Sequence, residues 1–261
     1  MSGYAALTSG DVWYDVHGRG DPLMLLHGGA VDSRFFDQNL RELSERFRVI
    51  RTDLWGHGRT GDREAPFSLE TFSDDVAELI ELVAGGQAHV LGHSIGAAVA
   101  LILALRRPDL VRRMVQISGG FRPDAELGTE ARPIDPLVEQ TVAFLGARYG
   151  EVSPDDEAHF PVVVRKDFEL SSREPDLSRE EVGAITTRTL VMAADDDITS
   201  LEDTLEFYRA LPDAELAIVP GTSHFLLQEK PALCNAIVLD FLANDPVPTV
   251  APIRRAPPPE G

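Results

Sequence analysis

The chain has 261 residues, of which 43% are hydrophobic, and this suits one large domain or a domain with an insertion. Its formal net charge of -19 disfavours nucleic acids and anionic membranes as partners. The single cysteine, Cys234, excludes an internal disulfide and a cysteine-cluster metal site. The N-terminus has no basic segment followed by an apolar one, so we expect an unexported, cytoplasmic protein.

Short apolar runs alternate with helical patterns over most of the chain. The expected elements, in chain order, are a hairpin at 4–17, a strand at 23–26, a helix at 33–46, a strand at 48–52, a helix from 68 or 71 to 84, a strand at 89–91, a helix at 97–105, and strands at 113–117, 189–193 and 216–219 with a helix at 201–211. This alternation predicts an α/β fold with a largely parallel sheet and helices on both faces. Right-handed crossovers then place every strand-to-helix turn at one edge of the sheet.

The pentapeptide Gly-His-Ser-Ile-Gly, residues 92–96, joins a buried strand directly to a helix of small residues. So sharp a turn strains the serine backbone, and Gly92 and Gly96 relieve the crowding around it. The turn exposes the Ser94 hydroxyl and places the Ile95 amide at a helix N-terminus, facing developing negative charge. We therefore predict that Ser94 is a nucleophile; the alternative is an ordinary turn with an incidental serine.

Glycines also follow the first buried strand, in the run His27-Gly28-Gly29-Ala30. They leave backbone amides uncovered, as an oxyanion hole requires. The candidate donor is Gly29, with Ala30 less favoured, and Ile95 would supply the second amide. The alternative is a plain glycine turn with His27 as a structural residue.

Gly56, Gly58 and Gly61 match the dinucleotide-binding pattern G-x-G-x-x-G after the strand at 48–52. That pattern requires a helix to open directly on it. Here a polar loop containing Pro66 follows instead, so the sequence argues against a nucleotide site.

Asp195, Asp196 and Asp197 follow the strand that resumes the sheet. Adjacent negative charges repel, so at least one of the three is expected to have a partner; the alternative is a solvated acidic turn. His224 lies in a loop just past the next strand and can reach the sheet edge that carries Ser94. A nucleophile, an acid and a base then follow one another along the chain.

From 121 to 187 the strand pattern stops, and helices are expected at about 135–148 and 154–171. An all-helical insertion after a sheet strand would sit over the carboxyl edge, so we predict a lid that excludes water; the alternative is a peripheral helical hairpin. His159 is expected at the surface. The apolar residues of these helices either line a pocket or pack the helix pair: Phe144, Tyr149, Phe160, Val163 and Phe168.

Five stretches in this order resemble the α/β-hydrolase superfamily, in the branch of single-domain serine hydrolases with a helical cap. They are Leu-Leu-His-Gly-Gly at 25–29, Asp-Leu-Trp-Gly-His-Gly-Arg-Thr at 53–60, Gly-His-Ser-Ile-Gly at 92–96, the acid turn at 194–197 and Pro-Gly-Thr-Ser-His at 220–224. The resemblance implies a mostly parallel eight-stranded sheet with helices on both faces and an inserted helical lid.

The resemblance also implies a division of the chain into a core, a cap and a tail. The core comprises 1–120 and 188–244, and the helical cap is 121–187. Residues 245–261 are rich in proline and have no apolar periodicity, so we expect an extended, disordered tail.

The implied catalytic triad is Ser94, Asp197 and His224, with the amides of Gly29 and Ile95 forming the oxyanion hole. Such a site performs acyl transfer in two steps. The histidine takes the serine proton as the serine attacks a carbonyl, and water then hydrolyses the acyl-enzyme.

The choice of acid is open at one point. In the family the acid usually stands three residues after a glycine that closes the strand, and this spacing points to Asp197. Ala194 replaces that glycine here, so Asp195 or Asp196 stays possible as the partner of the histidine.

Asp53 and His57 resemble structural residues of the family that anchor loops. No metal or organic cofactor is implied, and a small or medium carboxylic ester or lactone is the expected substrate. The alternatives on the same fold are a carbon-carbon bond hydrolase acting on a vinylogous diketone and a cofactor-free haloperoxidase or perhydrolase. A ligand receptor without turnover is the alternative from another class, and the oligomeric state stays open.

Overall fold

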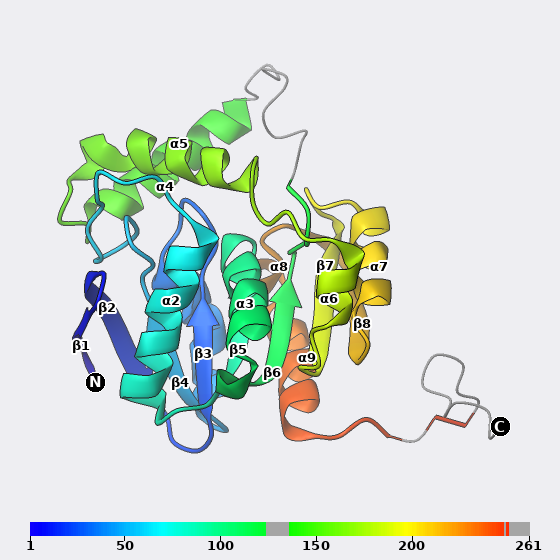
Figure 1. Cartoon of the computed structure of the whole chain (residues 1–261). Coiled ribbons are helices and arrows are strands. Elements are labelled where there is room, and N and C mark those ends of the chain that lie inside the picture. Colours follow the sequence, from blue (N-terminus) through cyan, green and yellow to red (C-terminus); the bar gives the residue numbers. More distant parts are fainter. Residues whose placement is uncertain (124–135, 248, 251–261) are drawn as a thin grey trace.

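The computed structural model describes residues 1–123, 136–247, 249 and 250. Among them, eight strands form one sheet in the order β1-β2-β4-β3-β5-β6-β7-β8 (Figure 1). The pairs β1–β2 and β2–β4 are antiparallel and the other five pairs are parallel, which confirms the predicted fold class. The bounds are β1 Ser2–Leu7, β2 Gly10–His17, β3 Pro22–Leu26, β4 Arg48–Thr52, β5 Ala88–His93, β6 Val111–Ile117, β7 Thr189–Asp196 and β8 Ala214–Ser223.

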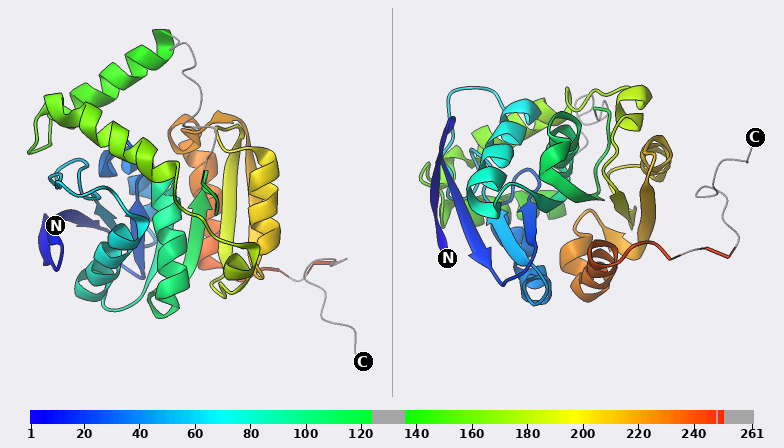
Figure 2. Two further views of the ribbon diagram at one scale, coloured as in Figure 1. Left: turned by 45° about the horizontal axis from the view of Figure 1, so that its top comes forward. Right: turned by 60° about the horizontal axis from the view of Figure 1, so that its bottom comes forward.

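Helices cover both faces of the sheet (Figures 1 and 2). Residues of α2, α3, α6 and α7 contribute to the hydrophobic core on one face, and residues of α1, α8 and α9 to the core on the other. Strand β3 lies between the two cores: Met24 and Leu26 enter the first, and Leu23 and Leu25 enter the second. A parallel strand that is buried on both faces has apolar residues at successive positions, so β3 could be recognised in the sequence as a continuous apolar run. The bounds are α1 Asp37–Ser44, α2 Leu69–Leu79, α3 Ile95–Arg106, α6 Arg179–Gly183, α7 Leu201–Ala210, α8 Leu226–Glu229 and α9 Pro231–Ala243.

Two expected helices differ from the prediction at one end. The helix at 33–46 opens with a 3-10 turn at Ser33–Phe36, and α1 follows it. The end of α2 widens into a π-helical turn, Ile80–Ala84, which closes on Gly85 in the left-handed conformation. None of the helices in the described part of the chain is long and apolar enough to cross a bilayer.

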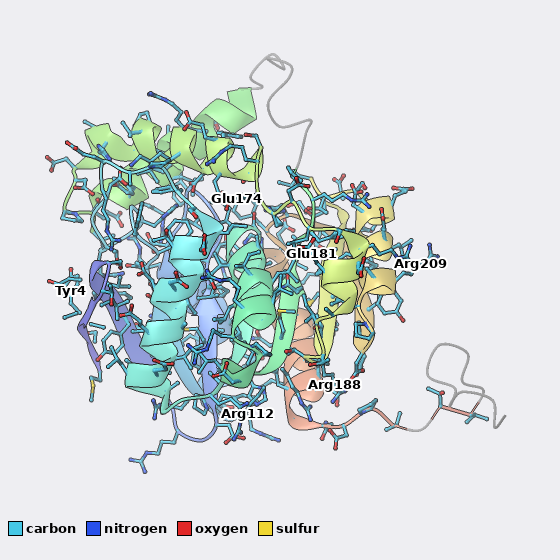
Figure 3. The ribbon with its side chains drawn as sticks, in the orientation of Figure 1. Tyr4, Arg112, Glu174, Glu181, Arg188 and Arg209 are labelled. Carbon is cyan, nitrogen blue, oxygen red and sulfur yellow. The ribbon has the colours of Figure 1, made fainter. Side chains whose placement is uncertain are left out.

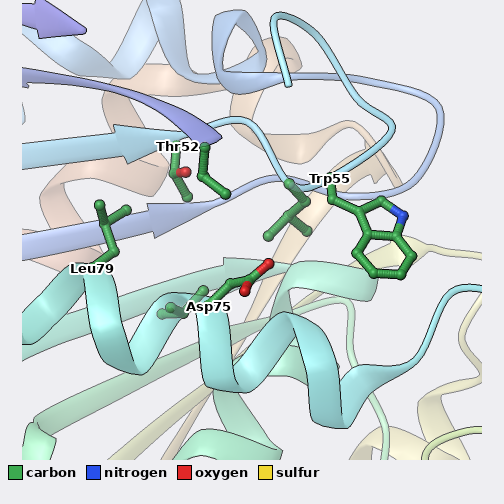
Figure 4. A pocket seen from close by; sticks show the side chains of 7 residues that line it. Thr52, Trp55, Asp75 and Leu79 are labelled. Atoms are coloured by element: carbon green, nitrogen blue, oxygen red, sulfur yellow. The ribbon is translucent and has the colours of Figure 1, made fainter. Parts of the chain in front are cut away.

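A cavity of about 10 Å³ lies in the first core, between the end of β4 and helix α2 (Figure 4). Thr52, Trp55, Asp75 and Leu79 are among its lining residues, and burial raises the pKa of the Asp75 carboxyl. The space suits about one water molecule. It is too small for a substrate, and none of the residues predicted for the site lines it.

The chain between β6 and β7 carries α4 (Pro136–Gly150), a 3-10 turn (Glu157–His159) and α5 (Phe160–Ser171) before α6. Helices α4 and α5 lie over the carboxyl ends of the strands (Figures 1 and 2). The second predicted helix starts at Phe160 rather than at 154. Asp156, with a φ of 63°, cannot belong to a helix, and Pro161 is suited to the first turn of one. Residues 124–135 of the predicted cap, and 248 and 251–261 of the predicted tail, lie outside the described residues.

Helix α6 was absent from the sequence prediction, although its start carries a recognisable signal. Ser178 and Glu181 form a capping box, in which the Glu181 amide donates to the Ser178 hydroxyl at 3.2 Å (Glu181 is labelled in Figure 3). The helix has only five residues, too few for a hydrophobic period to appear in the sequence.

Side chains of the helical segment between β6 and β7, which we call the cap, bind to the rest of the chain. His159 Nε2 lies 2.7 Å from a carboxylate oxygen of Asp62, and Lys166 Nζ lies 2.8 Å from the same carboxylate. His159 thus keeps 31% of its side chain exposed, and its contact with Asp62 adds a role to the expected surface residue. The Leu69 amide at the start of α2 donates to Glu174 at 2.8 Å (Glu174 is labelled in Figure 3).

The apolar residues of the cap divide into two groups. Tyr149, Phe160 and Val163 are buried, and the Tyr149 and Phe160 rings lie 5.5 Å apart. Phe144 and Phe168 are exposed. The first three therefore pack the cap, as the plainer of the two sequence interpretations expects.

Candidate active site

Ser94 occupies a strained turn between β5 and α3. Its φ of 54° and ψ of -120° are unfavourable for a residue with a side chain and cost about 1–3 kcal/mol. A Cβ on Gly92 would lie 2.1 Å from the Gly96 carbonyl oxygen, and a Cβ on Gly96 would lie 2.2 Å from the Leu26 carbonyl oxygen. Only glycine fits at either position, as the sequence predicts. Ser94 stays partly exposed while its two neighbours are buried.

Replacing Gly96 by alanine should therefore destabilise the fold by about 3 kcal/mol, because strand β3 would have to move away from the new methyl group. Urea unfolding of the purified variant measures this change. Gly120→Ala is the matched control, since a Cβ there meets nothing within 4 Å. The control should stay within about 0.5 kcal/mol of the parent protein. Equal stability of the two variants would contradict the proposed crowding.

His224 and Asp197 meet at the carboxyl edge of the sheet. His224 Nδ1 lies 2.7 Å from Asp197 Oδ1, and the Asp197 side chain is fully buried. Asp197 Oδ2 accepts hydrogen bonds from the Ser118 hydroxyl at 2.5 Å and from the Ala194 amide at 3.2 Å. Because the carboxylate only accepts, Nδ1 carries a proton and Nε2 is left as the basic nitrogen.

The other two carboxylates of the acidic run do not contact the histidine. Asp195 is exposed and accepts a hydrogen bond from the Thr222 amide at 3.1 Å, and Asp196 is exposed as well. Strand β7 continues to Asp196, beyond its predicted end, so Asp197 is the first of the three to leave the strand. Of the three acids that the sequence left open, the structure places Asp197 against His224.

Electrostatics keep Asp197 ionised. Burial alone would raise the pKa of its carboxyl, but the hydrogen bond and charge of His224, with the donors from Ser118 and Ala194, lower that pKa to about 2. The group therefore stays a carboxylate at every pH at which the folded protein would be assayed.

Sequence reasoning missed two residues that position this pair. Ser118 follows β6 with a φ of 51° and donates to Asp197. His93, next to the predicted nucleophile, donates from Nε2 to the His224 carbonyl oxygen at 2.8 Å and stacks on Phe35 at 4.5 Å. Burial, then the nearby His224, lowers the pKa of His93 to about 3, so His93 is neutral. The sequence offered one signal for both residues: His93 and Ser118 lie at the ends of predicted strands, where site residues were expected.

The glycine loop after β3 lies against the serine turn. A Cβ on Gly28 would lie 3.1 Å from the Ser94 Cβ. His27 holds the loop: its Nδ1 donates to the Gly28 carbonyl at 2.7 Å, and its Nε2 accepts from the Leu54 amide at 2.9 Å. Burial lowers the pKa of His27 to about 4, so it too is neutral.

The two predicted oxyanion residues are neighbours in this arrangement. A Cβ on Gly29 would lie 2.8 Å from the Ile95 side chain. The Ala30 amide, the less favoured candidate, donates to Asp167 of the cap at 2.8 Å and is therefore engaged.

The sequence model of the alpha/beta hydrolase family matches residues 23–237 of this chain. The chain belongs to this family. Its strained serine turn, the glycine loop and the Asp197–His224 pair lie within the matched region. The chain is accordingly a hydrolase.

Relatives of this hydrolase span nearly its full length. The provisionally named carbamate hydrolase RutD of Azorhizobium caulinodans is 28% identical over 91% of this chain and 97% of that protein. The 2-(acetamidomethylene)succinate hydrolase of Mesorhizobium japonicum is 27% identical over 86% of this chain and 89% of that protein. The crystal structure of an enol-lactonase from Burkholderia xenovorans has a TM-score of 0.75 at 20% identity, covering 93% and 100% of the two chains, and supports the fold.

Two further residues of this hydrolase shape the loops around the site. Asp53 accepts from the amides of Ser33 at 2.8 Å and Arg59 at 2.9 Å, so it anchors loops, as the resemblance implied. His57 does more than anchor a loop. Its Nε2 lies 3.2 Å from Oδ2 of Asp167, a cap residue that the sequence analysis did not single out.

Proposed function

We propose that this protein is a serine hydrolase that cleaves a small or medium carboxylic ester or lactone through an acyl-enzyme on Ser94. The observation that carries the proposal is the Asp197–His224 hydrogen bond at the sheet edge that also carries the strained, partly exposed serine. Ser94, Asp197 and His224 follow three parallel strands, β5, β7 and β8, and their common place at the carboxyl edge supports the proposed roles of nucleophile, acid and base.

The proposed reaction has two halves. His224 Nε2 takes the Ser94 proton as Oγ bonds to the substrate carbonyl carbon, and the amides of Gly29 and Ile95 bind the resulting oxyanion. The ester C–O bond then breaks, and the histidine returns the proton to the leaving oxygen. Water, deprotonated by the same histidine, releases the acid and frees the serine.

A panel of substrates tests this proposal. The purified protein should hydrolyse short p-nitrophenyl esters or a γ-lactone. For a p-nitrophenyl ester whose deacylation limits the rate, nitrophenol should appear in an initial burst of at most one equivalent of enzyme. A vinylogous 1,5-diketone and a peroxide-dependent halogenation assay are run beside it. Turnover of only one of these two, with no ester cleaved, would replace the proposal by the corresponding alternative. Failure to process any of them would favour the receptor.

A second candidate substrate class has the scissile carbonyl next to nitrogen. It is favoured by the names of two relatives, a carbamate hydrolase and a hydrolase of an acetamidomethylene compound. The same attack and oxyanion stabilisation would serve it, with an amine as the leaving group. Adding a simple carbamate and an N-acyl enamine to the panel distinguishes this class from the ester and lactone class.

A further inference from the structure

A carboxylate from the cap is buried against the predicted oxyanion hole. Asp167 lies on α5, and 9% of its side chain is exposed. A Cβ on Gly29 would lie 3.0 Å from the Asp167 Cγ and 2.8 Å from the Ile95 side chain. The carboxylate therefore stands beside Gly29, one of the two residues proposed to bind the oxyanion, although it comes from a different part of the chain.

Donors from the protein itself bind only one of the two Asp167 carboxylate oxygens. Asp167 Oδ2 accepts from the Ala30 amide at 2.8 Å and lies 3.2 Å from His57 Nε2. His57 Nδ1 lies 3.0 Å from the Trp55 carbonyl oxygen and must donate to it, so a proton on Nε2 is also needed to bond the carboxylate. Burial disfavours the imidazolium, but the Asp167 charge and hydrogen bond prevail and raise the pKa of His57. These contacts fix the orientation of the carboxylate.

The second oxygen is left without a donor. Asp167 Oδ1 is buried and has no hydrogen-bond partner among the described residues. A buried carboxylate oxygen without a donor is unfavourable, and native proteins rarely keep one without a reason. A donor brought by a bound substrate would satisfy this oxygen.

We propose that Asp167 determines substrate specificity: its Oδ1 accepts a hydrogen bond from an N–H or O–H group on the acyl part of the substrate. The same oxygen disfavours acyl groups that end in a carboxylate, because two acceptors of like charge repel. This inference rests on the proposed acyl transfer to Ser94. The favoured substrates are those small esters and related acyl compounds whose acyl chain carries a donor such as a carboxamide.

Three ethyl esters with acyl chains of the same length test the proposal. Ethyl succinamate ends in a carboxamide, monoethyl succinate in a carboxylate, and ethyl butanoate in a methyl group. The parent protein should prefer the succinamate to the succinate in kcat/KM. Asp167→Asn should reduce that preference about 10- to 100-fold, the range for a hydrogen bond to a charged acceptor. The change should appear mainly in KM, because the contact is remote from the reacting carbonyl.

Glu169→Gln is the matched control, since it removes an exposed carboxylate from the same helix. It should leave the rates for all three esters within about threefold of the parent. The butanoate rate of Asp167→Asn, together with its Tm, reports any general damage to the site. Should this variant fail to fold, calorimetric binding of the succinamate and the succinate to Ser94→Ala tests the same preference with Asp167 intact.

The outcomes separate the inference from the proposed function. Hydrolysis of the butanoate with an unchanged preference in Asp167→Asn, or tighter binding of the succinate by Ser94→Ala, overturns the role of Asp167 and leaves the serine hydrolase standing. A parent protein that cleaves none of the three esters and takes no fluorophosphonate on Ser94 overturns the proposed function itself.

Discussion

Replacing Ser94 by alanine is expected to abolish covalent labelling by a fluorophosphonate and to lower kcat by about 10⁴-fold or more. The reason is that the proposed covalent step has no substitute for this hydroxyl, which the strained turn presents at the sheet edge. Intact mass after incubation with the reagent measures labelling, and hydrolysis of a p-nitrophenyl ester measures turnover. The parent protein should gain the mass of one adduct.

Ser118→Ala is the informative control for this experiment. Ser118 also follows a sheet strand with a positive φ, and it lies at the same edge, where it donates to Asp197. Its loss should slow turnover but leave one adduct per chain. An adduct that survives in Ser94→Ala would place the nucleophile elsewhere. An unlabelled parent protein would mean that the serine is not activated.

Asp197→Asn is expected to lower kcat by about 10⁴-fold while the protein stays folded. The Asn carbonyl oxygen would keep the donors from Ser118 and Ala194, and this turns the amide NH₂ toward His224 Nδ1. Nδ1 must then accept a hydrogen bond, so the proton moves to Nε2. In that tautomer the imidazole cannot take the serine proton. The rate of ester hydrolysis measures the loss.

Asp195→Asn and Asp196→Asn are matched controls, because both carboxylates are exposed and neither contacts the histidine. Each should keep activity within about threefold of the parent, the effect of an exposed charge. A loss in either that equals the loss in Asp197→Asn would identify a different acid. The three variants remove the same charge from adjacent positions, so general electrostatic effects cancel in the comparison.

The lowered pKa of Asp197 makes the stability of the folded protein depend on pH. It is lowered from 3.8 to about 2 in the folded protein, so the unfolded chain takes up this proton first as the pH falls. The stabilisation is complete above about pH 4 and is lost between about pH 4 and pH 2. The acid limb of kcat/KM should therefore be unaffected by protonation of Asp197. Asp197→Asn should flatten the fall in stability below pH 4.

Local sequence was enough to predict the sheet and the serine turn. Buried parallel strands such as β3 appear as continuous apolar runs, and a strand that turns directly into a helix requires Gly92, because a Cβ there would meet the Gly96 carbonyl oxygen of the same turn. These features depend on steric limits within a few residues. The mostly parallel eight-stranded sheet that the family resemblance implied was confirmed as well.

Short-range pattern could not choose among three adjacent acids. Asp195, Asp196 and Asp197 are chemically alike, and where β7 ends decides which of them turns toward His224. That end depends on pairing with β8, which is distant in sequence. Helix α6 was missed because five residues carry too little periodicity.

The amino-acid sequence was sufficient for the fold class, the strained turn at Ser94 and the order of Ser94, the acidic run and His224 along the chain, because each depends on residues that lie close together or follow the strands. The three-dimensional packing was needed to see which acid meets the histidine and that Asp167 of the cap reaches the glycine loop and His57. Asp167 and Ala30 are 137 positions apart. A contact over such a distance depends on how the cap packs on the core, and periodicity in either segment carries no information about it.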